Sequence, residues 1–140
     1  MAYMSQDTKK ELAPAIKAVL KKYGVKGSIG VRNLSTLVVN IKSGQLDFIA
    51  ADRKIQEFRK HRGEHHILDG REYLSINPHY VSDWHNKVEE TTIADFFQEL
   101  ISAMKGDRWF DKSDIQTDYF DQAYFIEINV GKWDKPYQLN

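Results

Sequence analysis

The segment from Thr92 to Lys105 constrains the fold most, because it has the pattern of a helix with an unusually broad apolar face. Thr92 is a candidate N-cap, and Gly106 is a candidate stop. The apolar residues recur at three- and four-residue spacing: Ile93, Phe96, Phe97, Leu100, Ile101 and Met104. A face this wide has to be buried, so we expect this helix to pack on a sheet.

Two further segments have helical periodicity. Ser5 to Lys22 is amphipathic, with lysines on its polar face. Pro14 falls inside this segment, which predicts either a later helix start, with Pro14 in the first turn, or a kink. Leu46 to Arg62 is the second, and Gly63 should end it. The chain is therefore expected to contain two or three helices.

Strand patterns lie between these helices. Residues 29–31 and 37–41 are rich in Val, Ile and Leu, and the turn residues 33–35 between them predict an antiparallel hairpin. Residues 73–76 form a short strand candidate that stops at Asn77-Pro78. Tyr124 to Val130 alternates apolar and polar residues and ends at Gly131. The sequence thus predicts an α+β fold, with the helices packed on one mainly antiparallel sheet of about four strands.

Length and composition indicate one cytoplasmic domain. The 140 residues match the usual size of a single domain, here residues 1–140. The absence of cysteine excludes a disulfide scaffold, a thiolate zinc site and a cysteine nucleophile, and it favours a reducing compartment. No stretch approaches the roughly 20 apolar residues of a spanning helix. We expect no membrane segment and no apolar N-terminal targeting segment.

The charges are balanced overall but divided along the chain. Residues 1–70 carry 13 Lys and Arg against 7 Asp and Glu, a balance of +6, and residues 71–140 carry the reverse, a balance of −6. One hypothesis is that the first half binds nucleic acid through a basic patch. The alternative is that the two halves neutralise each other across the fold. The basic candidates are Lys21, Lys22, Lys26, Arg32, Arg53, Arg59, Lys60 and Arg62.

Two clusters could hold a metal ion, but neither has an established ligand spacing. His61, His65 and His66 lie beside Glu64, and they match no zinc pattern. The carboxylates Asp111, Asp114, Asp118 and Asp121 recur at three- and four-residue intervals, and they fail the pattern of a calcium-binding EF-hand loop. A solvent-exposed surface is the simpler interpretation of both. A metal-dependent hydrolase or nuclease built on either cluster remains a third hypothesis.

The usual catalytic motifs are missing from the sequence. It contains no glycine-rich phosphate loop, no Gly-x-Ser-x-Gly elbow and no His-Glu-x-x-His. We therefore assign no catalytic residue, no metal site and no cofactor, and we favour a protein that is not an enzyme.

Large aromatic residues near polar ones suit a partner interface, and Trp133 and Tyr137 are the two that we expect to be exposed.

Two segments carry a resemblance to a known family. They are Val25-Lys26-Gly27-Ser28-Ile29-Gly30-Val31-Arg32 and Lys112-Ser113-Asp114-Ile115-Gln116-Thr117-Asp118-Tyr119-Phe120-Asp121, which leads into the strand ending at Gly131. Together they resemble a small domain of the kind associated with large polyvalent proteins of phages and conjugative elements. The resemblance implies a protein encoded by a mobile element, in a family without an established activity. It provides no catalytic residues.

These observations lead to one primary hypothesis. The chain is an accessory protein of a phage or mobile element that acts in the host bacterial cytoplasm. It binds a host macromolecule, preferentially a protein, as an inhibitor or adaptor. Nucleic-acid binding is the second hypothesis. The predicted partner-binding residues are Ser113, Asp114, Asp118, Tyr119, Asp121, Trp133 and Tyr137.

Overall fold

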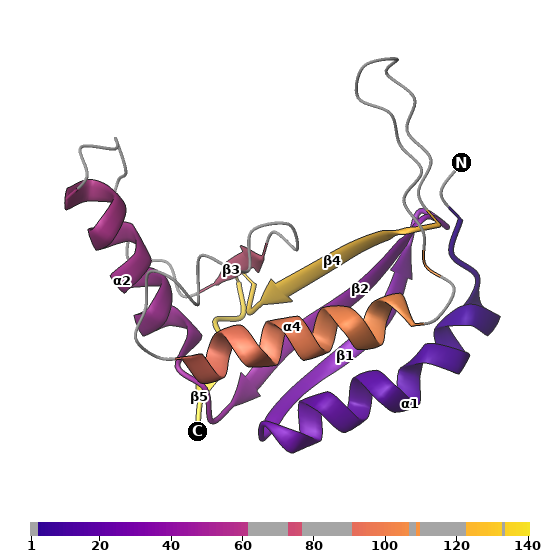
Figure 1. Cartoon of the computed structure of the whole chain (residues 1–140), viewed down its shortest axis with the longest axis horizontal. Helices are drawn as coiled ribbons and strands as arrows, with labels where there is room; N and C mark the ends of the chain where they lie inside the picture. Colours follow the sequence, from indigo (N-terminus) through magenta and orange to yellow (C-terminus); the bar gives the residue numbers. More distant parts are fainter. Residues whose placement is uncertain (1–2, 62–72, 77–90, 107–108, 110–122, 133) are drawn as a thin grey trace, which may run out of the picture.

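The computed structural model describes residues 3–61, 73–76, 91–106, 109, 123–132 and 134–140, with residues 55–61 and 91 described as helical backbone. Over these residues it contains three helices and one five-stranded sheet (Figure 1). The elements in chain order are α1 (Gln6–Lys22), β1 (Val25–Arg32), β2 (Thr36–Gly44), α2 (Phe48–His61), β3 (Leu74–Ile76), α4 (Thr91–Lys105), β4 (Phe125–Val130) and β5 (Gln138–Leu139).

The α+β class is confirmed, but the sheet differs from the prediction. The strand order is β1-β2-β4-β3, with β5 paired to the end of β2. β1 and β2 form the predicted antiparallel hairpin, and β3 is antiparallel to β4. β2 pairs in parallel with both β4 and β5, so the sheet is mixed and has five strands. Local periodicity identifies a strand but carries no information about its distant neighbour, which is why the parallel pairs were missed.

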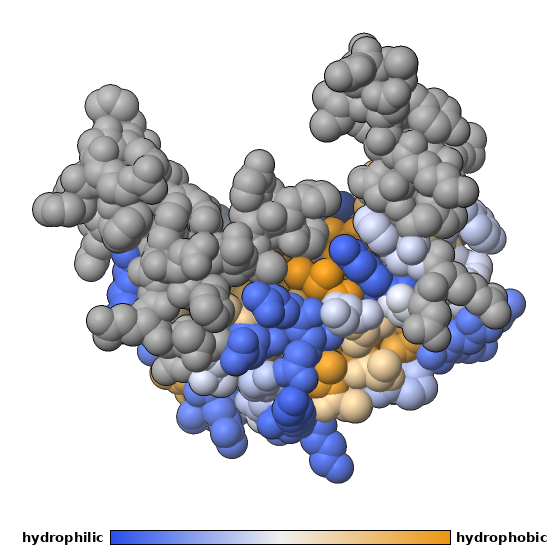
Figure 2. Space-filling view, in the orientation of Figure 1, coloured by the Kyte–Doolittle hydropathy of each residue, from blue (hydrophilic) through white to orange (hydrophobic). Residues whose placement is uncertain are grey.

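Two helices cover one face of this sheet. α1 and α4 lie side by side along it, and α2 projects from the end at which β5 lies (Figure 1). Phe96, Phe97 and Leu100 of α4 are fully buried and belong to one hydrophobic cluster with Leu37 and Val39 of β2. The predicted packing of α4 on the sheet is therefore confirmed. From this side, hydrophilic and apolar surface is intermixed over the described residues (Figure 2).

The helix ends show where sequence signals worked and where they failed. The Ser5 hydroxyl caps α1 by accepting from Thr8 N–H at 3.0 Å. The helix starts at Gln6 and runs through Pro14, so of the two alternatives, a later start or a kink, the later start is wrong. α4 starts at Thr91, so Thr92 lies inside the helix and is not its cap. Gly106 follows α4 with φ 62°, as predicted for a glycine stop.

None of the helices in the described ranges is long and apolar enough to cross a membrane.

Candidate functional site

The tip of the β1–β2 hairpin contains an exposed leucine in an unfavourable backbone conformation. Asn33 and Leu34 both have positive φ, 54° and 55°, and Ser35 N–H donates to Arg32 O at 3.2 Å. Two central residues with positive φ are typical of a type I′ turn, in which glycine is the usual second residue. Leu34 is 66% exposed, so burial offsets little of the roughly 1–2 kcal/mol that left-handed backbone costs an ordinary residue. Strain of this kind points to a role other than folding.

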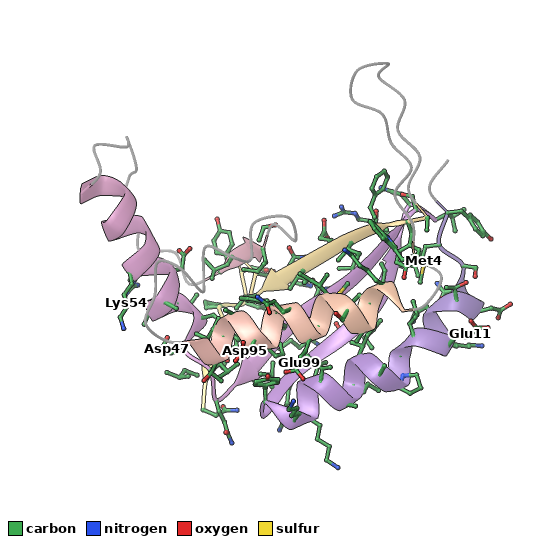
Figure 3. All side chains as sticks on the ribbon, in the orientation of Figure 1. Met4, Glu11, Asp47, Lys54, Asp95 and Glu99 are labelled. Atoms are coloured by element: carbon green, nitrogen blue, oxygen red, sulfur yellow. The ribbon has the colours of Figure 1, made fainter. Side chains whose placement is uncertain are left out.

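Two more large apolar side chains are exposed beside this turn. Tyr3 is 63% exposed and Phe125 is 47% exposed. Backbone hydrogen bonds tie both to the hairpin region: Phe125 N–H donates to Ser35 O at 2.8 Å, and Met4 N–H donates to Leu34 O at 2.7 Å. The Met4 side chain is fully buried at this end of the sheet, where it anchors the segment that carries Tyr3 (Figure 3). We call Tyr3, Leu34 and Phe125 the apolar tip.

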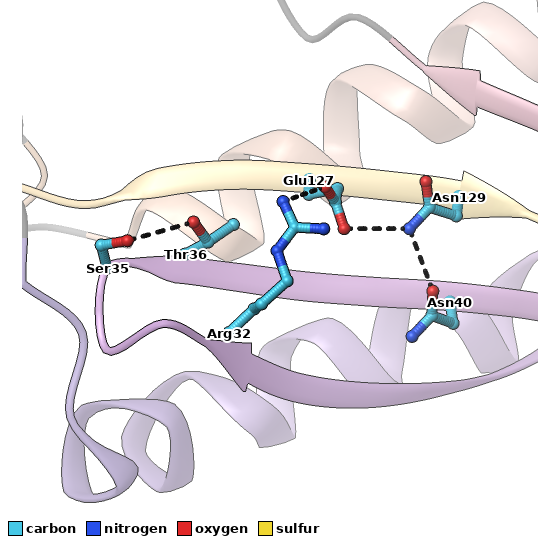
Figure 4. Close-up of polar contacts among 6 residues, drawn as sticks. All are labelled: Arg32, Ser35, Thr36, Asn40, Glu127 and Asn129. Carbon is cyan, nitrogen blue, oxygen red and sulfur yellow. Dashed lines mark hydrogen bonds and ion pairs between the residues drawn. The ribbon is translucent and has the colours of Figure 1, made fainter.

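The sheet face away from α1 and α4 carries a polar network behind the apolar tip. Figure 4 views this face, with the helices behind the sheet. Arg32 and Glu127 form an ion pair at 2.5 Å, in which the Glu127 side chain is 23% exposed. Asn129 Nδ2 donates to Glu127 Oε2 at 3.2 Å and to Asn40 Oδ1 at 3.0 Å. Arg32 and Glu127 therefore neutralise each other, and the amide of Asn129 holds Glu127 in place.

A groove of about 420 Å³ connects this network to Phe125. β3 covers only Ile128–Val130 of β4, because it ends at Ile76 before Asn77-Pro78. No described strand pairs with Phe125–Glu127 on that side of β4. The groove is lined by Arg32, Thr36, Ser75, Ile76, Phe125, Ile126 and Glu127.

The described residues on either side of residues 110–122 lie beside the apolar tip. Trp109 Nε1 donates to Tyr124 O at 2.9 Å, which holds the residues before and after 110–122 together. The Tyr124 hydroxyl donates to Met104 O and to Lys105 O, and burial raises its pKa to about 12. Ala123 O accepts from Tyr3 N–H at 3.0 Å. The predicted site residues within that segment lie outside the described residues: Ser113, Asp114, Asp118, Tyr119 and Asp121.

The two C-terminal aromatic predictions have different outcomes. Trp133 lies outside the described residues. Tyr137 is only 7% exposed, so the expectation that it forms part of an exposed surface is wrong. Its hydroxyl donates to Leu46 O at 2.7 Å, and its ring packs edge-on against Phe48 with centroids 5.2 Å apart. The unpredicted strand β5 follows Tyr137 directly and brings it into the core.

The basic candidates whose side chains the structure describes do not form one patch. Lys22 pairs with Glu99 at 2.7 Å and Arg32 pairs with Glu127, and both ion pairs join the basic half of the chain to the acidic half. For these two residues the neutralisation alternative is confirmed. Lys21 and Lys26 lie together around a cavity, whereas Arg53 lines a different one. The side chains of Arg59 and Lys60, and the whole of Arg62, lie outside the described residues.

Glu99 forms a second polar contact, with a tyrosine. The Tyr23 hydroxyl donates to Glu99, and this hydrogen bond is the main reason that the Tyr23 pKa rises to about 12. The hydrogen bond from Lys22, followed by that from Tyr23, lowers the pKa of Glu99. The three side chains join the end of α1 to α4.

Most residues of the two predicted metal-binding clusters lie outside the described residues. Asp111, Asp114, Asp118 and Asp121 are not described, nor are His65 and His66, and His61 is described as backbone only. Among the described side chains, no group of three or more His, Asp or Glu could hold a metal ion.

Comparisons with protein-family models, curated proteins and solved structures find no match to this chain.

Proposed function

We propose that this chain is a non-enzymatic binding module for another protein, with the apolar tip and the adjoining groove as its contact surface. The observation that carries this proposal is Leu34, which is exposed and held in left-handed backbone at the end of a hairpin. Glycine is the residue that a hairpin turn of this type usually has there. A partner that buries the Leu34 side chain provides a reason for leucine at this position.

The chemistry of the surface favours a protein partner. Large apolar and aromatic side chains and arginine are the residues that contribute most to protein–protein interfaces. Leu34 is the large apolar side chain of this surface, and Tyr3 and Phe125 are its aromatic side chains. Arg32 lies directly before the turn. Because Glu127 already neutralises Arg32, this surface has little attraction for the phosphates of a nucleic acid.

We extend the proposal to an accessory protein of a phage or mobile element that binds a host protein as an inhibitor or adaptor. The resemblance of the Ser113 to Asp121 segment motivates this step. Among the described residues, Trp109 before this segment contacts Tyr124, and Ala123 after it accepts from Tyr3 N–H of the apolar tip.

The test is capture of proteins from bacterial lysate by the tagged chain, with and without nuclease, followed by mass spectrometry. Leu34→Gly removes the exposed side chain and suits the turn. Leu139→Ala is the matched control, because Leu139 is 53% exposed on β5, at the other end of β2. We expect the wild type and Leu139→Ala to capture the same protein and Leu34→Gly to lose it, whether or not nuclease is present. Equal capture by Leu34→Gly, or capture that nuclease abolishes, would contradict the proposal.

A further inference from the structure

A second cavity lies at the other end of β2 from the apolar tip. Its volume is about 590 Å³, and it is formed where the C-terminal end of α1 meets the start of β1. Leu20 and Val25, each 5% exposed, give it apolar walls. The full lining consists of Lys17, Leu20, Lys21, Gly24, Val25, Lys26, Gly27, Gln45 and Asn140. We call it the lysine cavity, because Lys17, Lys21 and Lys26 are its only ionisable side chains.

The charged side chains that line the lysine cavity are all positive, whereas each of the three other cavities found among the described residues combines a positive with a negative side chain. The groove behind the apolar tip combines Arg32 with Glu127, and two cavities beside α2 combine Asp47 with Arg53 or with Lys54. The three cavity lysines form no ion pair with any described residue, although Lys22 next to them pairs with Glu99. A cleft with apolar walls and only cationic charged side chains concentrates anions from solution.

The backbone around the cavity is shaped to place Lys26. The pairing of β1 with β2 shifts register between Lys26 and Gly27, and such a bulge re-aims the side chain beside it. A Cβ at Gly27 would lie 2.5 Å from Asn40 O, so glycine is required for this close approach. Gly24 has φ 66°, and a Cβ there would lie 2.8 Å from Gln45 Cδ. Gly24 therefore permits the turn into β1, and Gly27 permits the close approach of β1 to β2 next to Lys26, which lines the same cavity as Lys17 and Lys21.

We infer that the lysine cavity binds a small phosphorylated molecule. Its volume falls within the range of about 300–1,000 Å³ typical of small-molecule sites. Lysine binds phosphate as a point charge, and three lysines suit an anion with more than one negative charge. The C-terminal end of α1 repels anions, and Lys21 and Lys22 in the last turn offset that repulsion.

A small ligand fits these observations better than a nucleic-acid strand does. The lining contains no aromatic ring on which a base could stack. A strand also needs a continuous basic track, and the ion pairs of Lys22 and Arg32 interrupt one. The site is independent of the apolar tip, so its failure would leave the proposed function unaffected.

The test is calorimetric titration of the full chain with pyrophosphate and with inorganic phosphate at low ionic strength. Lys17→Gln and Lys26→Gln each remove one cavity charge, whereas Lys10→Gln removes the same charge from an exposed position of α1 outside the cavity. We expect pyrophosphate to bind more tightly than phosphate. Each cavity variant should weaken binding roughly 5- to 10-fold, in line with the loss of one charged contact. The Lys10→Gln variant should bind like the wild type, and all four proteins should unfold at similar temperatures.

Three results would overturn the inference. The first is no heat of binding with millimolar pyrophosphate. The second is an equal loss of affinity in Lys10→Gln, because that would mean net charge rather than the cavity attracts the anion. The third is a duplex DNA complex that Lys26→Gln weakens but pyrophosphate does not displace, because the lysines would then serve a polymer. Amide chemical shifts of Gly24 and Gly27 that move with pyrophosphate in the wild type would support the cavity directly.

Discussion

Replacing Leu34 with glycine should leave the free energy of unfolding nearly unchanged, although it deletes a large apolar side chain. Relief of the left-handed strain should stabilise the protein by about 1–2 kcal/mol. Leu34 is 66% exposed, so the buried third of its side chain contributes only about 0.5–1 kcal/mol. The greater freedom of glycine in the unfolded chain costs about 0.5–1 kcal/mol. These contributions offset each other to within about 1 kcal/mol.

Urea denaturation of the wild type, Leu34→Gly and Leu37→Ala measures this directly. Leu37 is fully buried in β2, three residues further along the chain, so Leu37→Ala should lose about 2–5 kcal/mol. Leu34→Asn provides a second test, because asparagine tolerates positive φ and carries no apolar group. If Leu34→Gly and Leu34→Asn both lost 2 kcal/mol or more, Leu34 would be a structural residue and the apolar tip would not be a contact surface.

Other predictions concern the glycines and the titratable groups. Gly27→Ala should cost roughly 1–3 kcal/mol, whereas Gly30→Ala, where a Cβ would meet nothing within 4 Å, should change stability by less than about 0.5 kcal/mol in the same urea assay. The pKa of Glu99 is lowered on folding, so its contribution is present above pH 4.5 and is lost as the pH falls through the folded pKa. The stability difference between the wild type and Glu99→Gln should therefore shrink in acid, and a constant difference would contradict the contact. Burial raises the pKa of Tyr124 and Tyr137 from 10 to about 12, so their contribution is present below pH 10 and is lost between pH 10 and 12. Tyr137→Phe should remove one step near pH 12 from the ultraviolet titration of tyrosinate, and loss of a step near pH 10 instead would show that Tyr137 is not buried.

Local sequence patterns predicted most of the individual elements. The wide apolar face of Thr92 to Lys105 packs on the sheet as expected, and the turn at residues 33–35 connects the predicted hairpin. Long-range pairing was not predictable in this way. The parallel contact of β2 with β4 joins residues about ninety positions apart, and the two-residue strand β5 is too short to give a periodic signal. The burial of Tyr137 depends on β5, so it was not predicted because β5 was not predicted.

The candidate site was only partly accessible from the sequence. A leucine after Asn33, where a hairpin turn usually has glycine, was a visible signal, but its exposure and positive φ were not. Tyr3 and Phe125 join the apolar tip through backbone hydrogen bonds between segments far apart in the chain. The opposite charges of the two halves suggested mutual neutralisation, and the specific pairs of Lys22 and Arg32 required the fold.

Site-specific crosslinking tests the central claim most directly. The chain has no cysteine, so Leu34→Cys introduces a single thiol for a cleavable photo-crosslinker, and Leu139→Cys introduces one about 26 Å away along β2, at roughly 3.3 Å per residue. After irradiation in bacterial lysate treated with nuclease, we expect a specific protein to be crosslinked from position 34 and not from position 139. The same weak background from both positions would show that the apolar tip does not contact a protein partner.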